Sequence, residues 1–224
     1  MATKVTKHRD PLTREQVIDA ALRLMDDEGL DAVSMRRVAR EVGVEAMSLY
    51  NHVRDKEDLL DGVVERIMAE FVFPEASPDS DPMSYGREIA RGWRSLLKTH
   101  PNVMALFAHR HKPMRSIDSL RPMEVALRAL REMGLPVEDS VKAFQVIGGY
   151  IMGYVMMESG AMFTPGDDED ADAFARQIPA EELPCVAAAI PFMADCDVDA
   201  QFEFGLDLML EGLRARSARA ETAT

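Results

Sequence analysis

The chain has 224 residues, of which 47% are hydrophobic and 29% charged, a composition typical of a folded globular protein and not of a disordered one. Its two cysteines, Cys185 and Cys196, form no CxxC pair, which argues against a disulfide scaffold or a structural zinc site. The longest uncharged apolar stretch, 146–157, is shorter than the ~20 residues that cross a bilayer, and the N-terminus has no apolar signal segment. We therefore expect a cytoplasmic protein that makes no membrane contact.

The charge is distributed unevenly along the chain. Residues 1–56 contain ten Lys or Arg and ten Asp or Glu, so the whole net charge of -13 falls on the remainder. The basic arm, residues 1–10, opens with Lys4, Lys7 and Arg9 before any acidic residue. Two interpretations of this arm are open: a disordered terminus, or a segment that follows the minor groove of DNA. The charge distribution indicates a chain with two functional halves.

Short, well-delimited helices are predicted in the first half. Thr13 and Gln16 form a capping box that starts the first helix, and Gly29 fits the left-handed residue that ends it. The following helices are expected from Ser34 to Gly43, over 45–53, and from the cap Asp55 to Phe71.

The second half also shows helical periods only. The Pro-, Ser- and Asp-rich stretch 74–82 is predicted to be a loop between the halves. Residues 141–157 are apolar nearly all round, which indicates a helix buried on several sides. The last helix, 199–216, has more apolar positions than one core can bury, which favours a partner subunit. No convincing period-2 strand appears, so the predicted fold class is all-α.

A helix-turn-helix is predicted between Ser34 and Val53. Ala39 is a small residue where two helices cross, Gly43 occupies the turn, and Leu49 returns to the core. The two helix axes must pass close together and the turn favours a positive φ, which explains these residue types at this spacing.

The segment that contains this motif, and LYNHVRDKEDLL above all, resembles the DNA-binding domain of the TetR family of transcriptional repressors. The second half resembles the ligand-binding half of the tetracycline-repressor subgroup, in its Trp93…His100-Pro101 element and its ending FEFGLDLMLEGL. The resemblance implies a dimeric, all-helical repressor that a small molecule releases from its operator. The corresponding domains are a helix-turn-helix domain (11–56), a connecting helix (57–73), the loop (74–82) and a ligand-binding and dimerisation domain (83–224).

The expected DNA contacts fall into three groups. The start of the second helix and its dipole favour a phosphate, and the family pattern adds further backbone contacts. Asn can pair with adenine, Glu can accept from cytosine, and small apolar groups can touch a thymine methyl. No Arg or Lys lies within 45–53, so reading a guanine would require Arg36 or Arg37. The residues are Ser34, Met35, Arg36 and Arg37 at the helix start, Tyr50, His52 and Lys56 for the backbone, and Glu45, Ala46, Met47, Ser48 and Asn51 for the bases.

In the second half the resemblance implies an effector pocket and a four-helix dimer interface. A pocket rich in Met and aromatic residues suits a mostly apolar effector. The chain departs from the subgroup around His109 and at the central-helix glutamate, so we expect no metal and no cofactor. The pocket residues are Trp93, Met104, Phe107, His109, Met114, Gln145, Met152 and Met156, and the interface residues are Gly149, Gly153, Phe202, Leu206, Met209 and Leu213.

Two rival classes of function were compared with this hypothesis. The sequence has no Gly-rich phosphate loop, GxSxG elbow or HExxH motif, so an enzyme is not expected. A helix-turn-helix activator or co-regulator without an inducer remains the alternative, because repression depends on where the operator lies.

Overall fold

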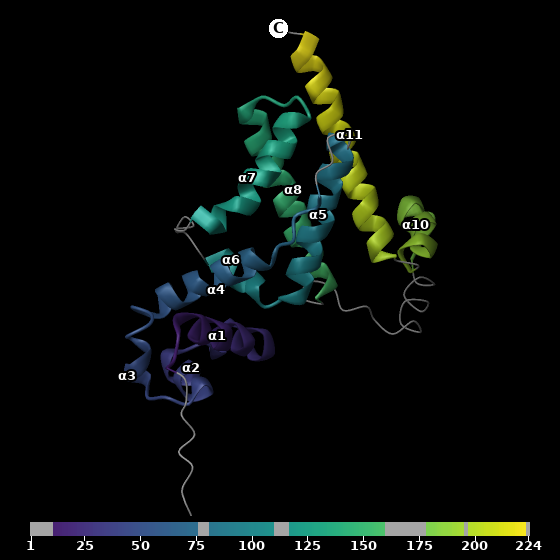
Figure 1. The fold of residues 1–224 in the computed structure, drawn as a ribbon. Helices are drawn as coiled ribbons and strands as arrows, with labels where there is room; N and C mark the ends of the chain where they lie inside the picture. The colour runs from purple at the N-terminus through teal and green to yellow at the C-terminus, as the bar shows by residue number, and fades with distance from the viewer. Residues whose placement is uncertain (1–10, 76–80, 110–116, 160–177, 195–196, 223–224) are drawn as a thin grey trace, which may run out of the picture. The chain divides into compact units, whose positions relative to one another are not determined.

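The computed structural model describes residues 11–75, 81–109, 117–159, 178–194 and 197–222, and every regular element in these ranges is a helix (Figure 1). The predicted all-α class is confirmed. The chain divides into two compact units, which are described separately. The N-terminal unit comprises Met1–Phe73 and Thr99–Glu124, and the C-terminal unit comprises Pro74–Lys98 and Val125–Thr224.

The N-terminal unit begins with the predicted capping box. Thr13 Oγ1 accepts the Gln16 N–H at 3.2 Å, and Gln16 Oε1 accepts the Thr13 N–H at 3.1 Å, so two otherwise unpaired amides are satisfied. The elements that follow are α1 (Arg14–Glu28), the 3-10 helix η1 (Leu30–Ala32), α2 (Met35–Val42), α3 (Ala46–Leu49), α4 (Lys56–Glu70), α6 (Val103–His109) and the first half of α7 (Ile117–Glu132).

Two local predictions in this unit were wrong in detail. Gly29 has the expected positive φ of 85°, but its ψ of 171° lies outside the left-handed helical region, because the chain turns directly into η1. The third helix is shorter than the predicted 45–53. After Leu49 the amides of Tyr50 and Asn51 bond to carbonyls three residues back, at 3.3 Å each, so the α-helix gives way to tight turns.

The core of the N-terminal unit lies between α1, α2 and α4. Val17 and Met25 of α1, Val38 of α2, and Leu59 and Ile67 of α4 are completely buried. Gly62 is buried in α4 where α1 approaches, and a Cβ at this position would lie 2.8 Å from Ile18 Cγ1. Helices α1 and α4 therefore form a closely packed pair.

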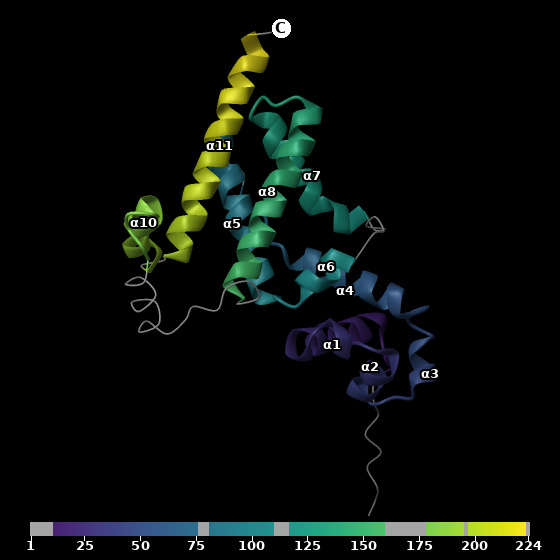
Figure 2. The ribbon, with the colours of Figure 1, turned by 180° about the vertical axis from the view of Figure 1, so that it is seen from behind.

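The C-terminal unit is built on long helices. It contains α5 (Pro82–Thr99) except for its last residue, the second half of α7, and three further helices: α8 (Val137–Glu158), α10 (Pro184–Ala194) and α11 (Val198–Thr222). Figures 1 and 2 both show α8 and α11 side by side, and the two helices are in contact. Leu130, Leu135 and Ala143 form a buried cluster where α7 turns into α8, and Ser217 Oγ of α11 donates to the Met133 carbonyl at 2.6 Å.

Within one protomer α8 is buried along one side. Ala143, Ile151 and Val155 are buried, whereas Val146 and Gly149 lie on an exposed face. Helix α11 is longer than the predicted 199–216, and α10 was not predicted. Part of the apolar surface of α8 and α11 is therefore exposed in the protomer.

Candidate DNA-binding surface and C-terminal sites

The helix-turn-helix is fixed by its caps and turn. Ser34 Oγ accepts the Arg37 N–H at 3.3 Å at the start of α2. Gly43 has φ 71° and ψ 40°, its N–H bonds to the Arg40 carbonyl at 3.2 Å, and the Val44 N–H bonds to the Ala39 carbonyl at 2.9 Å. This is a Schellman motif, which requires the left-handed residue that glycine supplies. The positive φ predicted for the turn is confirmed.

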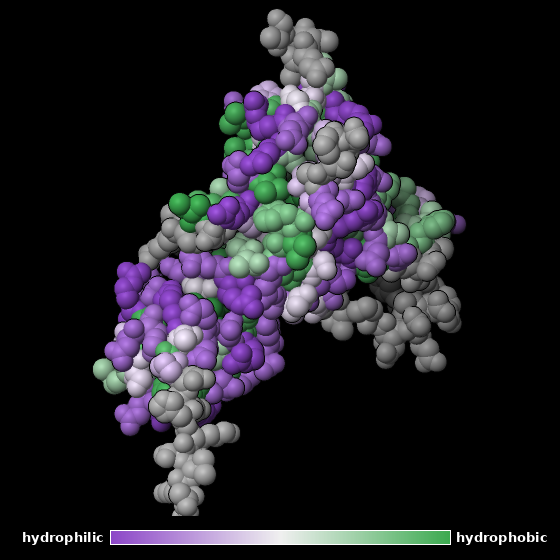
Figure 3. All heavy atoms as spheres, in the orientation of Figure 1, coloured by the Kyte–Doolittle hydropathy of each residue, from purple (hydrophilic) through white to green (hydrophobic). Residues whose placement is uncertain are grey.

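The residues predicted to read bases lie on and around α3. Leu49 is completely buried, so α3 has one inward face. Met47 is 74% exposed and Tyr50 is 47% exposed, and Glu45 and Asn51 are also exposed. Ala46, Ser48 and His52 are half-buried, and Lys56 is exposed at the start of α4. In the view of Figure 3 the described surface of this unit is mainly hydrophilic, with scattered hydrophobic spheres.

The two arginines at the start of α2 differ. Arg37 forms an ion pair with Glu28 of α1 and is half-buried. Arg36 is exposed, and Ser34 and Met35 before it are half-buried. Arg36 is therefore the more accessible of the two cations for an external anion.

Arg14 was not singled out from the sequence, yet it joins three elements. Its Nη1 donates to the His52 carbonyl at 2.9 Å, just after α3, and its guanidinium donates to both carboxylate oxygens of Asp58 in α4, at 3.1 and 3.2 Å. Burial acts to raise the pKa of Asp58, but the hydrogen bonds from Arg14 and from the Arg54 N–H outweigh it and lower that pKa. Arg14 thus fixes the end of the α3 segment against α1 and α4.

The predicted pocket residues are divided between the two units. Met104 is buried and Phe107 half-buried on α6, whereas Trp93 on α5 and Met152 on α8 are half-buried. Gln145 and Met156 of α8 are exposed, and His109 is the last residue of α6. The side chain of His109 and all of Met114 lie outside the described residues.

An ion cluster centred on the buried Arg94–Glu158 pair joins α5, α8 and α11. Arg94 Nε donates to Glu158 Oε2 at 3.1 Å, Arg94 Nη2 to Asp199 Oδ1 at 2.6 Å, and Lys98 Nζ to Glu158 Oε1 at 2.9 Å. The Arg94 guanidinium also lies 4.4 Å from the centroid of the Phe202 ring, a cation–π arrangement. The side chains of Arg94 and Glu158 are only about a tenth exposed, so solvent screens the attraction between them little.

This cluster also bears on metal binding. Burial acts to raise the pKa of Glu158, but the bonds from Arg94 and Lys98 outweigh it and lower that pKa, so the carboxylate is ionised and already neutralised. Across the described part of the chain, no group of three or more His, Cys, Asp and Glu side chains is placed to hold a metal ion.

Within the same ranges, no helix combines the length and apolarity of a membrane span.

Two of the predicted interface residues belong to the protomer's own core. Phe202 and Leu206 of α11 are completely buried, and the Phe202 ring stacks on Tyr150 with 5.4 Å between centroids. Tyr150 OH donates to the Phe202 carbonyl at 2.8 Å, and burial raises the pKa of Tyr150 to about 12. Phe202 and Leu206 are therefore already covered within the protomer, and Tyr150 of α8 and Arg94 of α5 contact Phe202.

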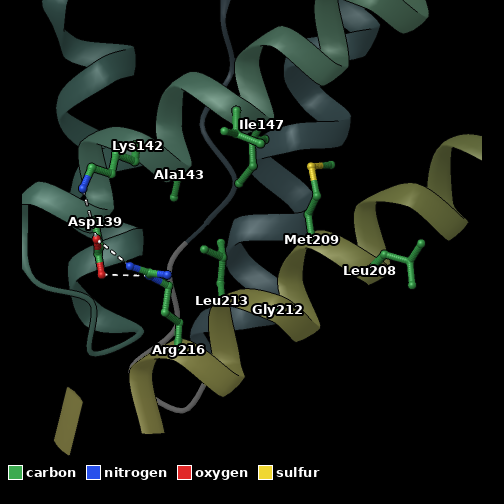
Figure 4. Close-up of a pocket in the computed structure, with 10 residues that line it drawn as sticks. Asp139, Lys142, Ala143, Ile147, Leu208, Met209, Gly212, Leu213 and Arg216 are labelled. Atoms are coloured by element: carbon green, nitrogen blue, oxygen red, sulfur yellow. Dashed lines mark hydrogen bonds and ion pairs between the residues drawn. The ribbon is translucent and has the colours of Figure 1, made fainter. Parts of the chain in front are cut away.

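The other face of α8 and α11 is open. Val146 is 61%, Phe204 67% and Leu208 55% exposed, and a Cβ on Gly149, Gly153 or Gly212 would meet nothing within 4 Å. Beside them the two helices enclose a groove of about 310 Å³, in which Figure 4 shows Ala143, Ile147, Met209 and Leu213 lying between α8 and α11. One end is closed by the Asp139–Arg216 ion pair at 2.9 Å. We call this surface the α8/α11 face.

The chain is similar to known regulators along most of its length. Residues 17–63 match the family described as bacterial regulatory proteins, tetR family, and residues 78–217 match the tetracyclin repressor-like C-terminal domain. The HTH-type transcriptional repressor DrrR1 of Streptomyces coeruleorubidus is 32% identical, over 95% of this chain and 82% of its own. Tetracycline repressor protein class A from transposon 1721 of Escherichia coli is 30% identical, over 89% of each chain.

A solved structure agrees with these matches over the whole fold. The Streptomyces coelicolor TetR family protein ActR, in complex with actinorhodin, superposes with a TM-score of 0.80 at 27% identity, over 95% of this chain and 100% of that one. The family resemblance inferred from the sequence is confirmed, and the chain belongs to the tetR family of bacterial regulatory proteins, whose members include transcriptional repressors.

Proposed function

We propose that the protein is a repressor that binds a palindromic operator as a homodimer and is released by a small, mostly apolar effector. The observation that carries the proposal is the short α3, in which Leu49 is buried and Met47 exposed, followed by exposed Tyr50 and Asn51, in a chain of the tetR family. The twelve residues named from the sequence for DNA contact are part of this proposal. Exposed Arg36 contacts a phosphate, and Asn51 reads a base.

Duplexes selected from a random library by the purified protein test this proposal. A palindrome with half-site centres one helical turn apart, ~34–36 Å, is the expected product. Arg36→Ala then weakens binding to every duplex and lowers the slope of log affinity against log salt by about one charge. Asn51→Ala instead relaxes the preference at one position of each half-site. A protein that enriches no sequence even at low ionic strength contradicts the proposal.

The homodimer is proposed to form through the α8/α11 face. A closed twofold dimer pairs the same patch on both subunits, and here the patch offers exposed Phe204 and Leu208 beside a groove lined by Ile147 and Met209. In such a dimer, Phe204 and Leu208 of each copy can pack against the exposed face of the other copy. Gly149 and Gly153 allow the close backbone approach that we predicted from the sequence.

Sedimentation velocity measures this association directly. Leu208→Glu places a carboxylate on the face and is expected to yield a monomer with unchanged helicity. Arg214→Glu, at an exposed position of α11 outside the patch, is the matched control and should remain dimeric. If Leu208→Glu sediments as wild type, the α8/α11 face is not the interface.

The effector is proposed to bind near the Met and aromatic residues named from the sequence. Small-molecule binding by ActR supports this proposal, as does the presence of Trp93 and Met152 as half-buried apolar side chains of the C-terminal unit. Because Glu158 is neutralised by Arg94 and Lys98, we propose an effector that needs no metal ion.

Trp93 is the single tryptophan of the chain, so its fluorescence reports on the proposed site. A compound panel should contain ligands that change this emission and also displace the selected duplex. Isothermal titration of such a ligand against Trp93→Ala should show weaker binding. Unchanged binding would remove Trp93 from the pocket, and a ligand that binds without displacing DNA would contradict induction.

A further inference from the structure

His100 occupies a junction in the chain. It directly follows α5, at the point where the chain leaves the C-terminal unit and enters the N-terminal unit. Its residue exposure is 6%, its Nδ1 lies 2.9 Å from Asp26 Oδ2, and its Nε2 lies 2.9 Å from Glu70 Oε2. A neutral imidazole has one N–H and can donate to only one carboxylate. Only the imidazolium satisfies both contacts.

The two carboxylates lie where negative charge is least favourable. Asp26 is in the last turn of α1 and Glu70 is the last residue of α4, and neither helix has a basic residue in its last turn. The C-terminal end of a helix carries partial negative charge, so a cation there is stabilising. Asp26 Oδ1 is also buried without a hydrogen-bond partner among the described residues. His100 supplies positive charge at both helix ends, and at the end of α4 it adds to that of Arg66, which also pairs with Glu70.

Other charged groups lie near the ring, and Arg66 shares the Glu70 carboxylate with His100. Arg66 of α4 lies 2.7 Å from Glu70 Oε1 and 3.0 Å from Asp19 Oδ1 of α1, so it forms ion pairs with both carboxylates. Asn102, before α6, donates to the Asp26 carbonyl at 2.9 Å without adding charge, and Asp31 of η1 is exposed. Burial acts to lower the pKa of His100, but the bonds to Glu70 and Asp26 outweigh it and raise that pKa above 6.5.

The same helix connects this cluster to the DNA-binding residues. Helix α1 has 15 residues and spans about 22 Å. At its first turn Arg14 holds the His52 carbonyl after α3 and the Asp58 carboxylate of α4, and at its last turn Asp26 holds His100. Helices α1 and α4 also pack closely at Gly62, so Arg14 and Asp26 belong to one closely packed helix pair.

We infer that protonated His100 is a positioning residue that locks the C-terminal ends of α1 and α4 and so holds α3 in its DNA-binding position, with operator affinity falling when the proton is lost. This inference rests on the proposed operator binding. The sign follows from linkage: the contribution is fully present below the unfolded-state pKa of ~6.5 and is lost as pH rises through the higher folded-state pKa.

The test measures affinity for a duplex selected by the wild-type protein, by fluorescence anisotropy between pH 6 and 9 at constant ionic strength. Wild-type affinity should fall about tenfold across this range, within the span of typical coupling between sites. His100→Gln should bind weakly at every pH with a flat profile, and Glu181→Gln, a control substitution at an exposed position of the C-terminal unit, should follow wild type. Glu70→Gln should move the midpoint to lower pH, since one of the carboxylates that raises the pKa of His100 is gone.

The outcomes distinguish the proposed role of His100 from operator binding, on which that role depends. If the wild-type protein selects no duplex, the proposal of operator binding is wrong. The contacts of His100 with Asp26 and Glu70 are then tested by unfolding: the free energies of unfolding of wild type and His100→Gln should converge as pH rises. A purely structural role predicts parallel pH profiles for wild type and His100→Gln. Such parallel profiles, or an unmoved midpoint in Glu70→Gln, would overturn the inference.

Discussion

Helices α1 and α11 both carry apolar residues on more than one side, but the chain covers them differently. In α1 every large apolar side chain, from Val17 to Met25, is buried, because α2 and α4 cover two sides. In α11 Phe202, Leu206 and Leu210 are buried, whereas Phe204 and Leu208 are exposed. A wide apolar surface thus completes a core in one unit and is partly exposed in the other.

The largest expected effect separates the two sides of α11. Phe202→Ala removes a completely buried ring that stacks on Tyr150 and lies under Arg94, and should cost about 3–5 kcal/mol of unfolding free energy. Phe204→Ala, two residues along, should cost the folded protomer less than about 1 kcal/mol.

Denaturant unfolding at several protein concentrations distinguishes these effects, because association adds a concentration-dependent contribution. The cost of Phe202→Ala should persist at all concentrations, whereas that of Phe204→Ala should disappear on dilution. Equal costs for the two variants at every concentration would contradict the division of α11 into a core side and an open side.

A smaller effect is expected at the buried ion cluster. Arg94→Met leaves Glu158 with Lys98 alone and should cost about 3 kcal/mol at neutral pH, because a partly buried carboxylate loses its main partner. Arg91→Met, which removes a half-exposed partner of Glu203, should cost less than about 1 kcal/mol.

The dependence on pH adds a second measurement. The lowered pKa of Glu158 means that its pairing stabilises the fold above its ordinary pKa of 4.5 and that this contribution is lost as pH falls through the folded-state value. The difference between wild type and Arg94→Met, measured by urea unfolding, should therefore shrink in acid. A constant difference would place the role of Arg94 in its contact with Phe202 and not in its charge.

The features that the sequence predicted correctly are local. The capping box at Thr13, the cap at Asp55 and the turn at Gly43 each depend on residues within four or five positions, which a pattern contains. The ion pairs that position the candidate sites join distant residues: Arg14 and Asp58 are 44 apart, and His100 and Asp26 are 74 apart. No spacing rule could connect them.

The side of α11 that stays exposed in the protomer is also decided by distant residues. Periodicity showed that α11 has two apolar stripes but could not show which one the protomer buries. The sequence-based choice contained Phe202 and Leu206, whereas the structure exposes Phe204 and Leu208. The deciding contacts come from Arg94 and Tyr150, on helices more than 50 residues away in sequence.

The smallest effect tests whether the open face of α8 has a partner. A Cβ at Gly149 or at Gly148 would meet nothing within 4 Å, so alanine at either position should stabilise the helix of the folded protomer by about 0.5–1 kcal/mol. Because Gly149 is the more exposed of the two, a second copy that approaches its backbone would be displaced by the added methyl group. We therefore expect Gly149→Ala to raise the melting temperature of a diluted sample while weakening association in sedimentation, and Gly148→Ala to raise it without weakening association. Equal association of the two variants would mean that the partner's backbone does not approach α8 at Gly149, and the interface would then depend on the side chains of α11 alone.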